Sequence, residues 1–314
     1  MPDQVAEVGG LTGVAERLRK VDLESGVEIG FNIADLTTYR VGGPAALFVR
    51  PTNGTELLGV AEALLDSEIP VLIVGRGSNM LIADAGFEGL AIQLGSGFEE
   101  IRCVGTRLTV GGAASLPVMA RHSVAEGLTG LEWAVGVPGS LGGAVRMNAG
   151  GHGSEMAEVL VDVTILDLTS AKMSVIEASE LNLGYRRSAV TSRQVVVSAT
   201  LDLAKGDRES GAALLTEIVR WRRENQPGGQ NSGSVFTNPP GDSAGRLIEL
   251  AGGKGLRIGS ACVSKRHANF IQADQDGSAD DVFDLMGEIR ELVMAAHGID
   301  LVAETVLVGF GDTT

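Results

Sequence analysis

Three polar side chains stand in otherwise apolar or small-residue segments and could take part in chemistry. Arg186 lies between two apolar segments, where its guanidinium could bind a carboxylate or phosphate through paired hydrogen bonds or simply face solvent. Ser234 lies in the small-residue segment 231–239, and its hydroxyl could donate a proton or only cap a turn. Glu304 opens the apolar run ETVLVGF, so its carboxylate is either an edge-strand charge or a functional acid.

Three glycine-rich segments could hold a large ligand through backbone groups. They cover residues 37–44, residues 74–81 directly after an apolar run, and residues 132–151. A strand followed by Gly-x-Gly-Ser-Asn leaves consecutive N–H groups with no side chain in the way, which suits a pyrophosphate. One such loop alone is better explained as a tight turn, but three in one chain favour a dinucleotide cofactor.

These segments depart from the commoner phosphate and nucleophile motifs. Met80 stands where G-x-G-x-x-G has its third glycine, and no Gly-Lys-Ser/Thr follows, so neither a Rossmann fingerprint nor a P-loop is expected. Pro138 replaces the first glycine of the hydrolase elbow, which argues against a nucleophilic Ser140. The four histidines are dispersed without metal-ligand spacing, so we expect no metal site.

Composition narrows the class of protein. A chain of 314 residues is expected to form two or three domains. The formal net charge of −15 argues against nucleic acid or an anionic membrane surface as the main partner. Two isolated cysteines suggest free, buried thiols, and neither a signal peptide nor an apolar run of about 18 residues is recognised. We therefore expect a cytoplasmic enzyme.

The pattern of apolar residues predicts an α+β protein. Helices are expected over residues 11–21, 56–67, 116–128, 208–225, 243–251 and 279–297. Strands are expected over residues 45–50, 71–75, 89–94, 99–105, 107–112, 159–168, 172–176, 194–204, 269–273 and 304–310. Around Asp207 the short apolar strands give way to a helix with a charged face. This change predicts the main domain boundary near residue 205.

Taken in order, these segments resemble the UDP-N-acetylenolpyruvoylglucosamine reductase (MurB) family. The resemblance runs from about Thr37 to Phe310 and rests on the pieces TTYRVGGPA, VGRGSNMLIAD, GLEWAVGVPGSLGGAVRMNAGGHGSEM, LGYRRS, NSGSVFTNP, AGRLIELAGGKGLRIGSACVSKRHANFI and AETVLVGF. It implies a VAO/PCMH-type FAD-binding region in residues 1–205, with lobes over about 30–95 and 96–205. A smaller α+β substrate domain is implied in residues 206–314.

The same resemblance implies an activity and its residues. The family uses NADPH and non-covalent FAD to reduce UDP-N-acetylglucosamine enolpyruvate to UDP-N-acetylmuramate in peptidoglycan precursor synthesis. By resemblance Arg186 holds the substrate carboxylate, Ser234 protonates C2 and Glu304 assists there. The implied substrate contacts are Asn238, His267 and Arg222. The implied FAD contacts are Tyr39, Arg40, Gly42, Gly75, Arg76, Gly77, Ser78, Asn79, Gly136, Pro138, Gly139, Gly142, Gly143, Ala144, Asn148 and Gly150.

The chain also departs from the family pattern. Asn225 stands where many members carry a lysine, so Arg222 or Arg223 would supply the cation at the substrate pyrophosphate. No tyrosine lies between Tyr185 and Ser234, which implies the shorter subtype without a substrate-closing tyrosine loop. The alternatives are another VAO/PCMH-type oxidase or dehydrogenase acting on an alcohol or sugar, and a non-catalytic nucleotide-binding protein. We expect a monomer with a UDP-sugar substrate.

Overall fold

The computed structural model describes residues 10–311 of the chain. These residues form two compact units that are not contiguous in sequence. The first unit comprises the chain up to Ile29, Ala46–Arg76 and Gly89–Trp221, and the second comprises Gly30–Ala45, Gly77–Glu88 and the chain from Arg222 onward. The domain boundary near residue 205 stays a prediction, and the two units are described separately.

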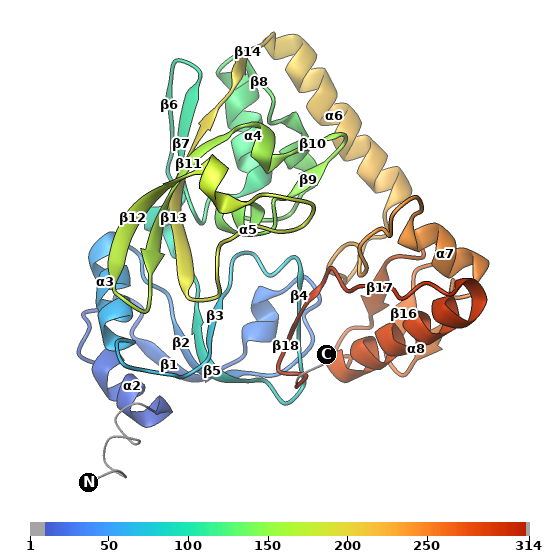
Figure 1. Cartoon of the computed structure of the whole chain (residues 1–314), viewed down its shortest axis with the longest axis horizontal. Helices are drawn as coiled ribbons and strands as arrows, with labels where there is room; N and C mark the ends of the chain where they lie inside the picture. Colours follow the sequence, from blue (N-terminus) through green and yellow to red (C-terminus); the bar gives the residue numbers. More distant parts are fainter. Residues whose placement is uncertain (1–9, 312–314) are drawn as a thin grey trace. The chain divides into compact units, whose positions relative to one another are not determined.

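The larger sheet of the first unit has five antiparallel strands in the order β12-β11-β13-β7-β6 (Figure 1). Its strands are β6 (Ile101–Val104), β7 (Arg107–Gly111), β11 (Leu160–Asp167), β12 (Lys172–Glu177) and β13 (Gln194–Asp202). The helices α4 (Leu116–Ala125) and α5 (Leu141–Arg146) belong to the same lobe. Alternate residues of a strand point to opposite faces, so each strand supplies one row of side chains to the core.

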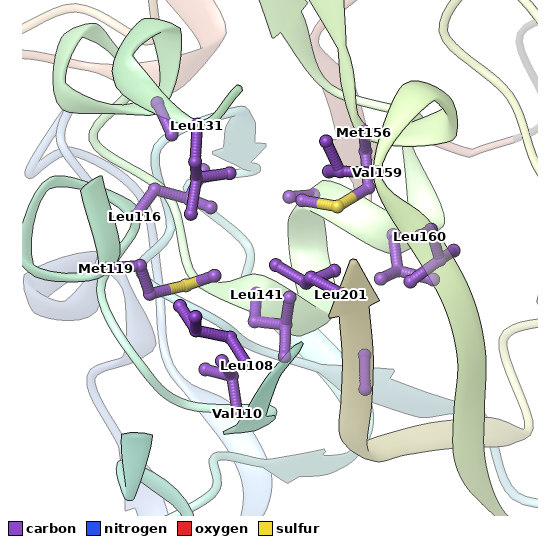
Figure 2. Close-up of a cluster of buried hydrophobic side chains, with 14 of the residues drawn as sticks. Leu108, Val110, Leu116, Met119, Leu131, Leu141, Met156, Val159, Leu160 and Leu201 are labelled. Carbon is purple, nitrogen blue, oxygen red and sulfur yellow. The ribbon is translucent and has the colours of Figure 1, made fainter. Parts of the chain in front are cut away.

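A continuous apolar core fills this lobe (Figure 2). Leu108 and Val110 from β7 meet Leu116 and Met119 from α4, and all four side chains are fully buried. Leu141, the first residue of α5, is also fully buried. Burying a side chain of this size stabilises a fold by roughly 1.5–3 kcal/mol. The third glycine-rich segment is therefore anchored by the lobe's own core.

A smaller sheet with strand order β1-β2-β5-β3 carries the N-terminal part of the fold. Its strands are β1 (Val27–Phe31), β2 (Ala45–Val49), β3 (Val71–Ile73) and β5 (Phe87–Ile92), and the helices α2 (Leu11–Leu18) and α3 (Gly54–Ala63) pack with it. Asn53 starts α3, because its side chain accepts a hydrogen bond from the Glu56 N–H at 3.0 Å, as the residue before a helix commonly does. β3 ends directly before the second glycine-rich segment.

The second unit combines a three-stranded sheet with two helices (Figure 1). The sheet contains β15 (Arg257–Ile258), β16 (Ala261–Val263) and β17 (Ile271–Ala273), and the helices are α7 (Ala244–Leu250) and α8 (Ala279–His297). β4 (Met80–Ile82) and β18 (Val306–Val308) pair in parallel beside them. The early segment 77–88 and the end of the chain are thus parts of one structure.

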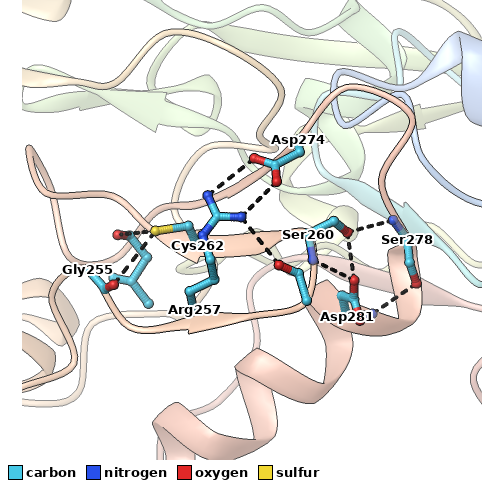
Figure 3. A network of polar contacts seen from close by, with 9 residues as sticks. Gly255, Arg257, Ser260, Cys262, Asp274, Ser278 and Asp281 are labelled. Atoms are coloured by element: carbon cyan, nitrogen blue, oxygen red, sulfur yellow. Dashed lines mark hydrogen bonds and ion pairs between the residues drawn. The ribbon is translucent and has the colours of Figure 1, made fainter.

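A polar network links the turn between β15 and β16 to the start of α8 (Figure 3). Asp281 accepts hydrogen bonds from the N–H and the hydroxyl of Ser260, each at 2.7 Å, and these bonds hold the pKa of its carboxyl below the ordinary value. The Ser260 hydroxyl accepts in turn from the Ser278 N–H at 2.8 Å. Nearby, Arg257 binds Asp274 with its guanidinium at 2.7 Å, which lowers the pKa of that carboxyl. The sheet turn is thereby tied to the helix.

Asp84 joins the early segment to the same helix. Its carboxylate accepts hydrogen bonds from the N–H groups of Ala279, at 2.9 Å, and of Asp280, at 3.3 Å, and from the Ser278 hydroxyl. A helix N-terminus carries unpaired N–H groups and a partial positive charge. Asp84, three residues after the second glycine-rich segment, therefore completes the cap of α8.

Most predicted elements are present, with shorter ends. The remaining helix α6 (Arg208–Asn225) and α8 match their predicted bounds, whereas the last strand is confined to Val306–Val308. The short strands not predicted are β8 (Leu128–Thr129), β9 (Gly150–Gly151), β10 (Ser154–Glu155) and β14 (Ala204–Lys205), beside β1, β4, β15 and β16. The short helical turns are η1 (Ile33–Leu36), η2 (Ser96–Phe98), η3 (Glu132–Gly136), η4 (Met156–Glu158) and η5 (Ala178–Leu181). Cys103 and Cys262 are free as expected but only half-buried.

None of the helices in residues 10–311 has the length and apolar character needed to cross a bilayer.

Candidate active site

Ser234 and Glu304 lie on two chain segments that pair within the second unit. The carbonyl of Val235, the residue after Ser234, accepts a hydrogen bond from the Glu304 N–H at 2.8 Å. One residue further on, Phe236 bridges to Ala303 in antiparallel register. Both predicted side chains are partly exposed. The structure therefore brings the predicted proton donor and the predicted carboxylate onto neighbouring backbone positions.

Asn79 is attached to the same place. Its side-chain amide donates to the Glu304 carbonyl at 3.0 Å, and its own carbonyl accepts from the Val306 N–H at 2.9 Å. Both contacts extend the parallel pairing of β4 with β18. Asn79, predicted to bind the cofactor, thus also fixes the backbone that carries Glu304.

Two buried hydroxyls reinforce this pairing. Ser232 and Thr305 are each 4% exposed, and their hydroxyl oxygens lie 3.1 Å apart, within hydrogen-bond distance. Below them Tyr39 is fully buried in the apolar core of the unit. Burial raises the pKa of Tyr39, and the nearby Ser232 offsets part of that rise. The Tyr39 ring therefore lies inside the core, and the residue exposes none of its surface.

His267 is held in a defined orientation. Its Nδ1 accepts a hydrogen bond from the Asn269 N–H at 3.2 Å, and its ring packs edge-on against Phe270 with centroids 4.8 Å apart. Burial, followed by the nearby Lys254, lowers the pKa of His267. The imidazole is therefore neutral near pH 7 and presents Nε2–H as its free donor.

The other two predicted substrate contacts, Asn238 and Arg222, differ in whether their polar groups are already bonded within the protein. Asn238 is exposed, and its Oδ1 accepts from the N–H of Ala244 at the start of α7 at 3.1 Å. Arg222 lies half-buried near the end of α6, and burial lowers its pKa. Its guanidinium has neither a hydrogen-bond acceptor nor an ion-pair partner in the described part of the chain. A buried cation without a partner is costly, so Arg222 is a strong candidate for binding an anionic group.

The second glycine-rich segment keeps a row of backbone donors available. Within residues 10–311, the N–H groups of residues 75–79 donate to no protein acceptor, whereas Val74 before them donates to the Ile92 carbonyl at 2.8 Å. Gly77 has φ +58°, and a Cβ there would lie 2.3 Å from the Leu36 carbonyl oxygen. Gly42 is equally confined, with φ +114° and a Cβ position 2.1 Å from the Ile82 carbonyl oxygen. These glycines permit a tight loop with unbonded amides, which pyrophosphate binding can use.

The third segment contributes close packing in the first unit. A Cβ on Gly75 would lie 2.6 Å from the Ser140 hydroxyl, so the second and third segments approach each other there. The N–H of Gly142 donates to the Gly112 carbonyl at 2.8 Å and that of Gly143 donates to the Ser140 hydroxyl at 3.4 Å. The amides of these two glycines are therefore already engaged, and their small size rather than their donors is what the structure uses.

The turn that carries Arg186 is fastened to the third segment. Asn148 is fully buried and donates its side-chain amide to the Gly184 carbonyl at 3.1 Å, while its Oδ1 accepts from the Ala157 N–H at 2.9 Å. Ser188 donates to the Arg146 carbonyl at 2.7 Å. Arg186 itself has φ +55°, which bulky residues rarely adopt outside sites where the fold imposes it. Its guanidinium lies 5.1 Å from the centroid of the Tyr185 ring.

The remaining predicted cofactor residues fall in the same two units. Arg40, Ser78 and Gly77 belong to the second unit, and Arg76, Gly136, Pro138, Gly139, Ala144 and Gly150 belong to the first. Arg40 and Asn148 both have positive φ, at 55° and 40°. Left-handed backbone thus recurs at three non-glycine residues of the predicted site, namely Arg40, Asn148 and Arg186, of which only the asparagine is a type that tolerates it well.

Comparison with known proteins adds the decisive observation. A reductase from Heliobacterium modesticaldum named UDP-N-acetylenolpyruvoylglucosamine reductase is 43% identical over 276 residues, which is 87% of this chain and 88% of that protein. The chain belongs to the UDP-N-acetylenolpyruvoylglucosamine reductase family. The family's C-terminal domain matches residues 225–308, and an FAD binding domain matches residues 45–173. The reductase of Bacillus subtilis is 36% identical over 88% of this chain and 92% of its own length.

Solved structures agree with this membership. The UDP-N-acetylenolpyruvylglucosamine reductase (MurB) of Thermus caldophilus is similar with a TM-score of 0.79 and 34% identity, covering 90% of this chain and 98% of that one. A glucose dehydrogenase, Phl p 4.0202, has a TM-score of 0.50 and 12% identity over 68% of this chain and 50% of its own, a likeness of fold alone. The predicted α+β, VAO/PCMH-type fold is confirmed.

The structure also has a surface pocket that the predicted catalytic residues do not line. The pocket, of about 520 Å³, belongs to the second unit and is lined by Arg257, Arg266, Cys262 and neighbouring residues, without Ser234 or Glu304. Arg257 pairs with Asp274 (Figure 3). Arg266 donates to the carbonyls of Arg223 and Gln226, at 2.9 and 3.1 Å. Its arginines therefore serve the fold rather than an open ligand site.

Sequence reasoning missed three buried residues that lie beside the predicted pair of segments. Asn269, Ser232 and Thr305 are buried polar residues beside the predicted pair. They stand inside motifs that were recognised, but a buried asparagine and a surface one look alike in sequence. Among the described residues, no group of three or more His, Cys, Asp and Glu side chains is arranged to hold a metal ion.

Proposed function

We propose that this chain reduces UDP-N-acetylglucosamine enolpyruvate to UDP-N-acetylmuramate, using NADPH and non-covalent FAD, as the printed name of its relatives indicates for them. The observation that carries the proposal is the pairing of the Ser234 segment with the Glu304 segment. A reductase of this kind needs a proton donor and an acid or base at one reacting carbon. The family membership supplies the substrate, and the paired backbones supply the geometry.

FAD fits the groups that the chain offers. The amides of residues 75–79, which donate to no acceptor within residues 10–311, suit its pyrophosphate, and the glycines at 42 and 77 keep side chains out of the loops that would cradle it. Arg40 and Arg76 are exposed cations on those loops and would add charge-assisted hydrogen bonds. Bound FAD supplies a hydride acceptor for NADPH and a hydride donor for the vinyl carbon C3 of the substrate.

The chain's own side chains handle the charge and the proton. Arg186 binds the substrate carboxylate in two parallel hydrogen bonds and stabilises the negative charge that develops beside C2. The Ser234 hydroxyl donates the proton that C2 needs, and Glu304 assists at the same carbon. A serine hydroxyl is a weak acid in water, so its contribution depends on fixed geometry rather than on its pKa.

Two anionic parts of the substrate require separate contacts. Arg222, a half-buried cation with no acceptor among the described residues, binds the diphosphate. It thereby supplies the positive charge that many family members obtain from a lysine at the position of Asn225. His267, neutral and oriented, donates Nε2–H to a polar group of the nucleotide. Asn238 keeps its amide N–H₂ for the substrate, since only its oxygen is engaged.

Three broader assignments accompany this function. We assign residues 1–205 to cofactor binding and residues 206–314 to substrate binding. The protein acts in the cytoplasm, where the nucleotide sugar and NADPH are found, and it acts as a monomer. Size-exclusion chromatography with light scattering checks the last assignment, because a dimer would double the mass of 32.5 kDa.

The test is NADPH consumption with the authentic enolpyruvyl UDP-sugar. Wild-type protein should purify yellow and consume NADPH only when the substrate is present. Removing a transition-state hydrogen-bond donor typically costs about 10²–10³ in rate, so Ser234→Ala should lose at least about 10² in kcat. Ser174→Ala, an exposed serine on β12, is the matched control and should keep full activity.

Two results would favour the alternatives. NADPH oxidation that depends on oxygen or on a simple sugar alcohol, and not on the UDP-sugar, would indicate an oxidase or dehydrogenase of the same fold. A colourless protein that binds nucleotides without NADPH consumption would indicate a non-catalytic binding protein. Full activity of Ser234→Ala would remove the proposed proton donor.

A further inference from the structure

We propose that Asn269 is the positioning residue that sets the geometry of Ser234 and, through its backbone, of His267. The inference rests on the proposed function, because it concerns how that function's proton donor is held in place. Asn269 was not among the residues singled out by sequence. It stands out in the structure because every one of its polar groups is used, and each is used on a neighbour of the site.

The Asn269 side chain binds both backbone polar groups of Phe236, which lies two residues after Ser234. Its Oδ1 accepts from the Phe236 N–H at 3.0 Å, and its Nδ2 donates to the Phe236 carbonyl at 2.8 Å. Only 4% of Asn269 is exposed, so no water competes for these bonds. An amide that pairs with both polar groups of one peptide residue behaves like a strand partner and fixes its φ and ψ.

The Asn269 backbone adds two further contacts. Its carbonyl accepts from the Val235 N–H at 2.9 Å. Its N–H donates to His267 Nδ1 at 3.2 Å, which leaves the proton of the neutral imidazole on Nε2. One residue therefore holds the two peptides that follow Ser234 and also selects the histidine tautomer.

The residue before Ser234 is a glycine, whose backbone has more conformational freedom than that of other residues. Gly233 precedes it with φ +82° and no atom within 4 Å of its Cβ position. The backbone from Val235 onward is the part of the loop that carries the pairing with Glu304. Fixing residues 235 and 236 thus determines where the Ser234 hydroxyl points relative to Glu304.

The test is a double-mutant cycle on kcat with the enolpyruvyl UDP-sugar. Asn269→Asp keeps the size and the acceptor but turns the donor that faces the Phe236 carbonyl into an acceptor. A misplacement of about 1 Å can cost about 10²-fold in rate, so we expect Asn269→Asp to lose about 10- to 100-fold in kcat. In the Ser234→Ala background the same change should cost less than about twofold, because the group it positions is gone.

A pH profile gives a readout that a purely structural role would not move. The protonated carboxyl of the Asn269→Asp variant has one donor and one acceptor, like the amide it replaces. Its kcat relative to wild type should therefore recover as the pH is lowered, since burial and the facing carbonyl favour the neutral form. His267 and the charged Lys254 and Glu249 beside it are present in both proteins, so the variant is compared with wild type at each pH.

Each outcome decides the question. Equal losses for Asn269→Asp in both backgrounds, or a kcat ratio that does not rise at lower pH, would overturn the inference while leaving the proposed function intact. An unchanged kcat for Ser234→Ala alone would overturn the proton donor and the inference together. Flavin absorbance per protein and the thermal unfolding midpoint identify a variant that fails to fold. In that case Asn269→Ser, which keeps a hydroxyl donor, is measured in the same double-mutant cycle, and equal losses in both backgrounds would overturn the inference.

Discussion

Replacing Gly77 by alanine should weaken both the fold and cofactor binding, and the structure sets the size of the effect. An L-residue in left-handed conformation costs roughly 1–2 kcal/mol, and Gly77 has φ +58°. The new methyl group would lie 2.3 Å from the Leu36 carbonyl oxygen and 2.6 Å from the Thr37 Cα. These are backbone atoms that cannot rotate away, and overpacking of this kind costs about 1–3 kcal/mol. The free energy of unfolding should fall by about 2–5 kcal/mol.

Gly30→Ala separates the two contributions. Gly30 has φ +67° and no atom within 4 Å of its Cβ position, so it carries the conformational cost without the collision. Urea unfolding of the two variants should differ by about 1–3 kcal/mol. Only Gly77→Ala should also lose bound flavin, measured as absorbance near 450 nm per protein, because its collision displaces the amides of residues 75–79. If the two variants unfold alike and bind flavin alike, the close approach of these segments does not govern the loop.

Three further outcomes follow from contacts elsewhere. Asp84→Ala should lower the free energy of unfolding by about 1–2 kcal/mol, the range for losing a helix N-terminal cap, whereas Asp35→Ala, an exposed aspartate in the same unit, should change urea unfolding little. Burial raises the pKa of Tyr39 above its ordinary value, so the folded state holds the phenolic proton more tightly than the unfolded state. Stability should therefore fall as the pH rises above about 10, and Tyr39→Phe should remove that fall in unfolding midpoints measured at pH 8 and pH 10.5. Arg222→Gln should raise KM for the UDP-sugar about 10- to 100-fold, as loss of a charged hydrogen bond implies, and should leave the unfolding midpoint unchanged or higher. Arg220→Gln changes an exposed arginine of the same helix and should alter neither KM nor the midpoint.

Long periodic elements were predictable from sequence because their apolar spacing alone specifies them. The helices 208–225 and 279–297 match the structure at both ends, since capping residues and a sustained helical pattern mark them. Strands of two or three residues, such as β4 and β15, carry too few residues for any periodicity. They exist because a partner far along the chain pairs with them, and sequence does not reveal that partner.

The candidate site residues could be chosen from the sequence, whereas the residues that support them could not. Ser234 and Glu304 were recognisable as polar residues in small or apolar settings, and their segments do pair. The amides of Gly142 and Gly143 looked as available as those of residues 75–79, but the structure uses them internally. Whether an N–H is free depends on which carbonyl folds back against it, and this is decided by tertiary structure. The same holds for Asn269, whose role depends entirely on burial.

The parallel pairing of β4 with β18 has a consequence for how the chain is made. Asn79 and the Glu304 carbonyl it binds are separated by 225 residues. On the ribosome β4 therefore leaves the exit tunnel long before its partner is synthesised, and contacts so distant in sequence form slowly. A nascent chain that stops short of Glu304 would leave the edge of β4 open to other chains, so β4 gains its partner only after β18 has been synthesised.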